Sequence, residues 1–86
     1  MPKTQAQRRR ETVKRDRADH EACMQREGGI CQRCGSTATQ THHGRTKRPD
    51  LRHDPRHHVA VCYDCHIWFH QHPSDARAWL ESRGMW

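Results

Sequence analysis

The residues with the clearest chemical meaning in this chain are two Cys-x-x-Cys pairs, Cys31/Cys34 and Cys62/Cys65. Each pair can aim two thiolates at one metal ion from a single tight turn, and Gly35 relieves the backbone where the first turn is sharp. Four thiolates from two such pairs complete the tetrahedral shell of a closed structural zinc site. The spacing therefore predicts one structural Zn²⁺ bound by all four cysteines.

Four histidines between and after the cysteine pairs could hold a second metal ion. His66 and His70 are one helical turn apart and can bind one ion from the same face of a helix. His42 and His43 are neighbours in a segment expected to be extended, where adjacent side chains point to opposite sides, so one can join that ion while the other faces water. Imidazole ligands that leave positions open for water and a phosphate oxygen are typical of a catalytic metal. The sequence assigns no role to three other histidines, His20, His53 and His72.

The composition explains why so short a chain needs a metal. Only 31% of its 86 residues are apolar, which is too little hydrocarbon for a comfortably stable core. Residues 1–19 contain no apolar run typical of a signal peptide, and no stretch is long enough to span a bilayer. We therefore expect a cytoplasmic protein without a membrane partner, in which paired cysteines bind metal rather than form disulfides. The fifth thiol, Cys23, is expected to be a small packed residue.

The charge balance favours a polyanionic partner. Sixteen Lys and Arg residues against ten Asp and Glu residues give a formal net charge of +6 and a pI of about 9.6. A zinc ion on four thiolates lowers this charge by about 2 and a second divalent ion on neutral imidazoles restores it, so the metallated protein stays basic. Nucleic acid is the expected partner. Basic side chains after the central histidines could hold phosphates without reading bases; they are Arg45, Lys47, Arg48, Arg52 and Arg56.

Short helices and strands are expected around these residues. Good helix formers predict a helix over about 11–27, ended by Gly28-Gly29, and the ten residues before it are expected to be a disordered basic arm. Arg8-Arg9-Arg10 in that segment fits a solvated tail and a phosphate contact equally well. A strand over 37–41, a loop over 44–56 and a strand over 57–61 are expected next. A helix then begins at about Asp64 and is stopped by Pro73. A last helix through Trp79 and Leu80 is expected to be capped by Ser74 or Asp75 and closed by Gly84.

The order and spacing of these motifs resemble the HNH endonuclease family. The resemblance runs from Gly29 to His72, about half of the chain, and consists of Cys-x-x-Cys-Gly, His-His, a short strand and Cys-x-x-Cys-His-x-x-x-His. It implies a small α+β fold in which a ββα-metal (His-Me finger) hairpin and helix, stapled by the four-cysteine zinc site, lie between N- and C-terminal helices. The implied domains are a basic arm and helix over 1–27, the HNH zinc domain over 28–73 and a C-terminal helix over 74–86.

The resemblance also implies a role for each histidine. His42, the first residue of the central pair, corresponds to a metal ligand, as do His66 and His70. His43 corresponds to the general base, which takes a proton from water as that water attacks the phosphorus of a phosphodiester in DNA, with double-stranded DNA favoured. The implied products are a 5′-phosphate and a 3′-hydroxyl. A short, free-standing chain of this kind resembles family members encoded by bacteriophages. This resemblance implies a phage terminase as a candidate partner and the cytoplasm of a bacterial host as the compartment.

Two positions depart from the usual family pattern. His57 stands where the signature Asn, nine residues before His66, is expected, and its imidazole could orient His43 by accepting the ring N–H. His58 competes for this role if the register slips by one residue. His42 stands where many members carry Asp. Three neutral imidazoles without a carboxylate suit Mn²⁺, Ni²⁺, Co²⁺ or Zn²⁺ better than Mg²⁺, so we expect weak activity with magnesium alone.

Three other interpretations use the same residues. The cysteines could be two unrelated buried thiol pairs, although their paired spacing argues against it. Cys62-Tyr-Asp-Cys65-His66 also matches the c-type haem attachment motif, but haem attachment normally needs export and would leave Cys31 and Cys34 without a role, so no haem is expected. Finally, the chain could be a non-catalytic, zinc-stabilised nucleic-acid-binding module that kept the fold while its centre changed.

Overall fold

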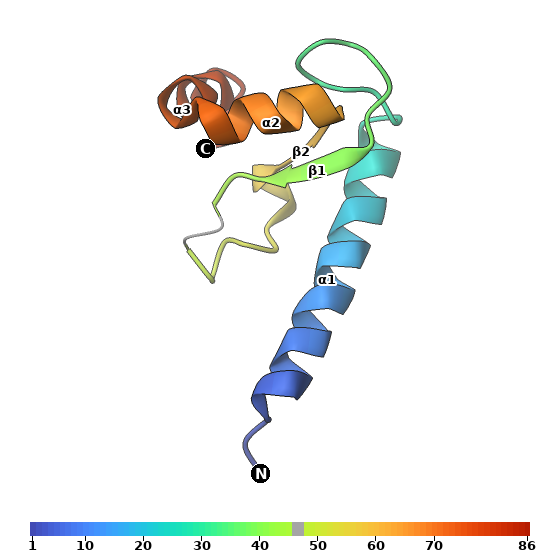
Figure 1. The fold of residues 1–86 in the computed structure, drawn as a ribbon, viewed down its shortest axis with the longest axis vertical. Coiled ribbons are helices and arrows are strands. Elements are labelled where there is room, and N and C mark those ends of the chain that lie inside the picture. Colours follow the sequence, from blue (N-terminus) through green and yellow to red (C-terminus); the bar gives the residue numbers. More distant parts are fainter. Residues whose placement is uncertain (46–47) are drawn as a thin grey trace.

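Three α-helices and one two-stranded antiparallel hairpin form the protein in the computed structural model, which describes residues 1–45 and 48–86 (Figure 1). The elements are, in chain order, α1 (Gln5–Arg26), β1 (Gln40–His43), a short 3₁₀ turn η1 (Pro55–His57), β2 (His58–Val61), α2 (Tyr63–Gln71) and α3 (Pro73–Ser82). The predicted small α+β class, with helices before and after a hairpin, is confirmed.

The hairpin lies at the centre of the fold. β1 pairs with β2 in antiparallel register, with Thr41 opposite Ala60 and His43 opposite His58. Every residue of β2 is buried, because α1 and α2 both pack against the hairpin (Figure 1). Since successive residues of a strand point to opposite faces, His42 faces α2 and His43 faces α1. The expectation that the two central histidines separate is confirmed.

One core connects the hairpin to the helices and to the cysteine turns. Its buried members are Cys23, Cys31, Ala38, Val59, Ala60, Val61, Cys65, Phe69, Ala76 and Leu80. Cys23 packs into this core from α1, as predicted for the fifth thiol. Two of the predicted zinc ligands, Cys31 and Cys65, are core residues as well, so a change at the cysteine cluster acts directly on the packing of the domain.

α1 is longer than the sequence suggested. It begins at Gln5 rather than near residue 11, because Thr4 and Gln7 form a capping box. Thr4 Oγ1 accepts from Gln7 N at 3.1 Å, and Gln7 Oε1 accepts from Thr4 N at 2.8 Å. From Gln5 onward, the segment expected to be disordered is therefore helical, and Figure 1 shows it extending away from the hairpin. Within the described parts of the chain, no helix is both long and apolar enough to cross a bilayer.

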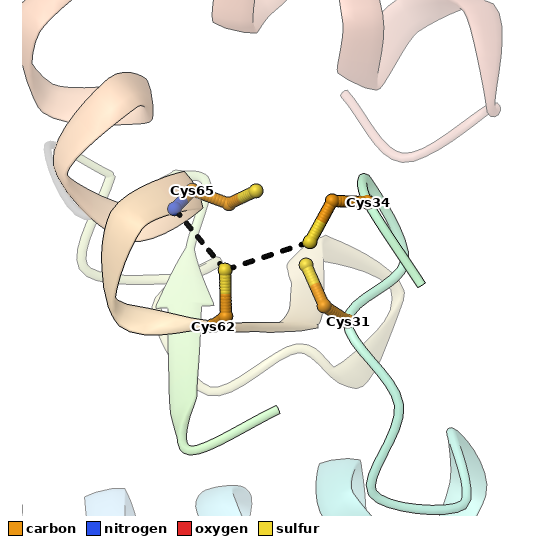
Figure 2. Close-up of side chains that lie close together, drawn as sticks. All are labelled: Cys31, Cys34, Cys62 and Cys65. Atoms are coloured by element: carbon orange, nitrogen blue, oxygen red, sulfur yellow. Dashed lines mark hydrogen bonds between the residues drawn. The ribbon is translucent and has the colours of Figure 1, made fainter. Parts of the chain in front are cut away.

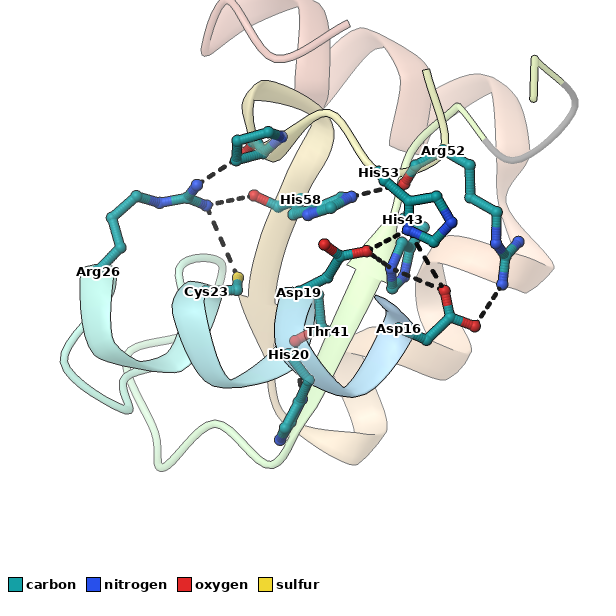
Figure 3. Close-up of polar contacts among 11 residues, drawn as sticks. Asp16, Asp19, His20, Cys23, Arg26, Thr41, His43, Arg52, His53 and His58 are labelled. Carbon is teal, nitrogen blue, oxygen red and sulfur yellow. Dashed lines mark hydrogen bonds and ion pairs between the residues drawn. The ribbon is translucent and has the colours of Figure 1, made fainter. Parts of the chain in front are cut away.

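The C-terminal half of α1 is fixed to the hairpin by polar side chains (Figure 3). His20 Nδ1 lies 2.8 Å from Thr41 Oγ1 of β1. The Arg26 guanidinium donates to the carbonyl oxygen of Pro55 at 2.8 Å and to that of His58. These contacts hold α1 across both strands and fix which of its residues face β1.

Both strands begin later than predicted. The strand expected over 37–41 begins at Gln40, because Thr37 instead forms an isolated bridge with Ile30 across the first cysteine turn. The second strand begins one residue late, since His57 belongs to η1. The central histidines therefore lie inside a paired strand rather than beyond its end.

α2 and α3 follow each other almost without a break. α2 begins at Tyr63, with Cys62 as its N-cap. α3 begins at Pro73. Proline is tolerated in the first turn of a helix, because backbone N–H groups there have no partner within the helix and the missing N–H of proline costs no hydrogen bond. The predicted capping by Ser74 or Asp75 is wrong, because both residues lie inside α3.

The packing of α3 into the core gives a first test. Leu80 is 1% exposed, so we expect Leu80→Ala to lower the free energy of unfolding by about 2–5 kcal/mol through lost burial and a residual cavity. Urea unfolding of the zinc-loaded protein, followed by far-UV circular dichroism, measures this. Val13→Ala on α1, where the side chain is 54% exposed, is the control and should change stability by less than about 0.5 kcal/mol. Equal effects would contradict the role of α3 in the core.

Candidate metal centres

The four predicted zinc ligands form one cluster. Sulfur atoms of Cys31, Cys34, Cys62 and Cys65 all lie within 4.8 Å of one another (Figure 2). The Sγ atoms of Cys34 and Cys62 are 3.6 Å apart, close to the separation of about 3.8 Å between two sulfurs of a tetrahedral site with Zn–S bonds of about 2.3 Å. The cysteines form no disulfide. This arrangement is compatible with a structural zinc site.

Backbone geometry shapes both halves of the cysteine cluster. In the first turn, Gly35 N donates to Cys31 O at 2.9 Å, and Gly35 has a φ of 81°, which strongly favours glycine. Gln32 N donates to a carbonyl oxygen of β2 at 3.0 Å and holds this turn against the hairpin. In the second half, Cys62 is the N-cap of α2, and its sulfur accepts from Cys65 N at 3.4 Å. The cluster therefore joins the start of α2 to the hairpin.

The thiols of the cluster differ in acidity. Burial raises the pKa of the Cys65 thiol to about 12, although Arg33 Nη1, 3.5 Å from its sulfur, opposes the shift. Burial acts in the same direction on Cys31, but N–H donors of the turn outweigh it and leave its pKa below the ordinary value. Hydrogen bonding from Ser36 lowers the pKa of Cys34. A bound cation would stabilise all four thiolates, so metal binding would release protons.

Three of the predicted histidines also meet. Ring nitrogens of His42 on β1 and of His66 and His70 on α2 lie within 4.8 Å of one another. The Nε2 atoms of His66 and His70 are 3.1 Å apart, near the separation of about 3.4 Å for two nitrogen ligands of a tetrahedral ion with bonds of about 2.0–2.1 Å. The hairpin and the following helix thus bring together ligands that are far apart in the sequence.

Gln40 orients one of these rings, a contact that sequence analysis missed. Gln40 Oε1 lies 3.0 Å from His66 Nδ1. Because an amide oxygen only accepts, Nδ1 carries the ring proton and Nε2 keeps its lone pair for a metal ion. A second partner of this kind is common for metal-binding histidines.

Burial prepares His42 for ligation. Its ring stacks on Phe69 with centroids 4.6 Å apart, and its Nδ1 is buried without a hydrogen-bond partner. Burial first, and then the neighbouring rings of His66 and His70, lower the pKa of His42 to about 4. The ring is therefore neutral at pH 7 and can offer a lone pair. A buried polar atom without a partner is costly, so this position fits a metal ligand.

The histidine cluster borders an open pocket of about 570 Å³. Its lining combines apolar side chains, among them Phe69 and Leu80, with three arginines, Arg45, Arg48 and Arg77. Cationic side chains around candidate metal ligands suit an anionic group such as a phosphate.

His43 lies on the other face of β1, against α1 (Figure 3). Its Nε2 is 3.7 Å from Asp19 Oδ2 and 3.9 Å from Asp16 Oδ1, and its side chain is only 14% exposed. Burial and the neighbouring His58 ring lower the pKa of His43, although the two carboxylates oppose the shift. The ring is therefore mostly neutral at pH 7, as a proton acceptor must be. His43 also borders the pocket.

The acidic residues around His43 were missed by sequence analysis. Asp16 and Asp19 meet His53, whose Nδ1 lies 2.6 Å from Asp19 Oδ2 (Figure 3). Burial favours the protonated form of Asp16, but the Arg52 guanidinium, 2.8 Å from Asp16 Oδ2, outweighs it and holds the pKa of that carboxyl below its usual value. Asp16 and Asp19 are three residues apart and share one helical face, but no local signal in the sequence shows that this face meets β1.

His57 does not take the predicted position beside His43. Its Nδ1 lies 3.0 Å from the carbonyl oxygen of Met85, because η1 turns the side chain toward the C-terminal segment. The neighbour of His43 is His58, with ring centroids 4.4 Å apart. His58 is 1% exposed, and its Nε2 lies 2.7 Å from Arg52 O. Of the two histidines that the sequence left open, the strand register brings His58 to His43.

The predicted phosphate-binding loop residues have partners inside the protein. Their partners are the Trp86 ring for Arg45, Asp50 for Arg48, Asp16 for Arg52 and Asp54 for Arg56. Lys47 lies outside the described residues. Arg45 and Arg48 still border the pocket, whereas Arg52 belongs to the network around His43.

No protein-family model, curated protein or solved structure matches this chain. The resemblance to the HNH family therefore stays a prediction from the motifs. The two candidate metal centres are interpreted from the arrangement of their own side chains.

Replacing one cluster cysteine tests the zinc site. We expect Cys65→Ser to abolish binding of one zinc ion per chain and to unfold the domain, because structural zinc contributes about 10–16 kcal/mol of apparent binding energy in small zinc domains. Metal analysis and circular dichroism measure the two effects. Cys23→Ala is the matched control, since Cys23 is equally buried but lies outside the cluster. Zinc retained at full stoichiometry in the Cys65 variant would refute the assignment.

Removing one histidine tests the second centre. We expect His66→Ala to abolish binding of an exchangeable Mn²⁺ or Ni²⁺ ion while the cysteine-bound zinc persists, because the remaining two rings bind an ion far more weakly. Titration calorimetry together with metal analysis separates the two ions. His72→Ala, at the end of the same helix but outside the cluster, should bind both ions like the wild type. If the His66→Ala and His72→Ala variants bind the exchangeable ion with the same affinity, this metal centre is contradicted.

Proposed function

We propose that this protein is a metal-dependent HNH endonuclease that hydrolyses phosphodiester bonds in DNA. The observation that carries the proposal is the convergence of His42, His66 and His70 beside an arginine-lined pocket, with His43 on the same strand as His42. The proposal includes the finer fold assignment, in which β1, β2 and α2 form a ββα-metal unit stapled by zinc. Its support is the direct continuation of β2 through Cys62 into α2.

The three histidines fit a divalent ion of intermediate softness. All three can be neutral, and no carboxylate belongs to their cluster among the described residues, so Mn²⁺, Ni²⁺, Co²⁺ or Zn²⁺ suits them better than Mg²⁺. An ion bound there supplies charge neutralisation at the scissile phosphate and at the departing 3′-oxygen. Arg45 and Arg48 at the pocket would hold neighbouring phosphates.

His43 is proposed as the general base. Its Nε2 is buried against Asp16 and Asp19, so the nitrogen available to deprotonate water is Nδ1. The two carboxylates would then stabilise the imidazolium that forms when Nδ1 takes the proton. Their present distances of 3.7 and 3.9 Å exceed hydrogen-bond length, and such contacts often tighten only with substrate bound. In this scheme His58 limits the ring orientation of His43.

One observation favours a second candidate function, the non-catalytic nucleic-acid-binding module. The His43 side chain is 14% exposed and partly covered by α1, which restricts the approach of water to the proposed base. In such a module the histidine cluster would have only a structural role, and the protein would bind DNA without cutting it.

Plasmid nicking separates the two functions. Full-length, zinc-loaded protein with added Mn²⁺ or Ni²⁺ should convert supercoiled plasmid to nicked or linear forms, more slowly with Mg²⁺ alone. His43→Ala should slow cleavage by about 10²–10⁴-fold, because the base is lost. His72→Ala, purified identically, should cut like the wild type and shows that no contaminating nuclease is responsible for the difference. If the wild type and His43→Ala leave the plasmid equally intact, the nuclease proposal is refuted and the non-catalytic binding module is supported.

A further inference from the structure

Almost all of the net charge of the protein lies at one end of one helix. Residues 1–15, called here the helical arm, carry six basic side chains and one acidic side chain, a net charge of +5 out of +6 for the whole chain. Residues 16–86 carry ten basic and nine acidic side chains, a net charge of +1. Figure 1 shows the arm extending away from the hairpin, and all of its residues except Thr12 are exposed.

The arm differs from the rest of the protein in how its cations are used. Eight of the nine arginines in residues 16–86 have an acidic or aromatic partner among the described residues, as Arg56 has with Asp54 and Arg83 has with the Trp79 ring, and Arg17 is the exception. In the arm, Lys3 pairs with Glu11. The other five basic side chains of the arm form no ion pair within the described residues; they are Arg8, Arg9, Arg10, Lys14 and Arg15.

The charges of the arm disfavour the helix that carries them. Positive side chains near a helix N-terminus oppose the helix dipole, and the first turn of α1 contains no acidic residue. Arg10 and Lys14 add a like-charge pair one turn apart. The helix is nevertheless well started, because the Thr4–Gln7 capping box satisfies its first N–H groups. Bound anions along the arm would remove the repulsion.

From these observations we propose that the helical arm is a docking surface for the sugar-phosphate backbone of duplex DNA, with the helix lying in or across the major groove. The helical part of the arm, residues 5–15, is about 16 Å long at about 1.5 Å per residue, which spans about five base pairs. Its five unpaired cations are distributed over residues 8–15, and such a row of charges suits a row of phosphates better than a single point anion.

Charge and shape favour duplex DNA over two other polyanions. An anionic membrane surface would require an apolar stripe opposite the charged one, but Val13 is the single large aliphatic residue between Gln5 and Arg15. A-form RNA has a major groove too narrow for a helix, whereas the major groove of B-DNA admits one. The same helix continues to Asp16 and Asp19 beside His43, so DNA held by the arm would be joined rigidly to the proposed catalytic face.

Salt-dependent binding tests the arm without any cleavage. Fluorescence anisotropy of a labelled duplex is measured with zinc-loaded, full-length protein and no added second ion. The arm variant, Arg9→Gln/Arg10→Gln/Lys14→Gln, keeps good helix formers and should reduce the slope of log affinity against log salt by about 2–3, with an affinity loss of about tenfold or more at moderate salt. The paired variant, Arg56→Gln/Arg83→Gln, removes two cations that have partners and lie outside the pocket lining, and it should lose less than half as much of the slope per charge removed.

Each outcome decides a different question. Circular dichroism and zinc content of both variants establish that they are folded. An unchanged slope in the arm variant, or an equal loss per charge in the paired variant, would overturn the docking surface. Equal affinity for an RNA duplex, or for vesicles containing anionic lipid, would overturn its assignment to duplex DNA. The inference rests on the proposed function only for the identity of the substrate. If the wild type binds DNA through the arm but does not nick plasmid, the nuclease proposal is refuted and the docking surface is still supported.

Discussion

The pairing register of β1 and β2 is the constraint on which the rest of the molecule depends. With His43 opposite His58, the alternation of side chains sends His42 toward α2 and His43 toward α1. A slip of one residue in β1 would exchange these two faces. The register therefore keeps one candidate ligand on a different face from one candidate base.

Cys62 joins this register to the second set of candidate ligands. It directly follows β2, its sulfur belongs to the cysteine cluster, and it is also the N-cap of α2. His66 and His70 on that helix are thereby held at a fixed distance from the hairpin. A protein with so few apolar residues gains this precision from one residue with two roles, because a larger core is not available to it.

The features of this site that are set by local patterns were predictable from the sequence, whereas those set by long-range contacts were not. The Cys-x-x-Cys turns, the one-turn spacing of His66 and His70 and the alternation at the central pair are set by backbone geometry, and all were readable from the sequence. The capping box at Thr4 and Gln7 was also readable, although the helix start was predicted too late. The choice of His58 over His57 was not readable, because it depends on η1, which carries His57 toward Met85 and away from His43. Contacts of Asp16, Asp19 and Gln40 depend on docking between elements, which no local signal gives.

The reversal of charge within α1 follows from its two environments. Its N-terminal half meets solvent and can carry unpaired cations, whereas its C-terminal half packs on the hairpin and would bury them. At Asp16 and Asp19 the helix instead presents carboxylates to His43, Arg52 and His53. Any cation in that position would oppose both Arg52 and a protonated His43. One continuous helix therefore separates an outward cationic surface from an inward anionic one, and a shift of α1 along the hairpin would disturb the proposed DNA contact and the environment of the proposed base together.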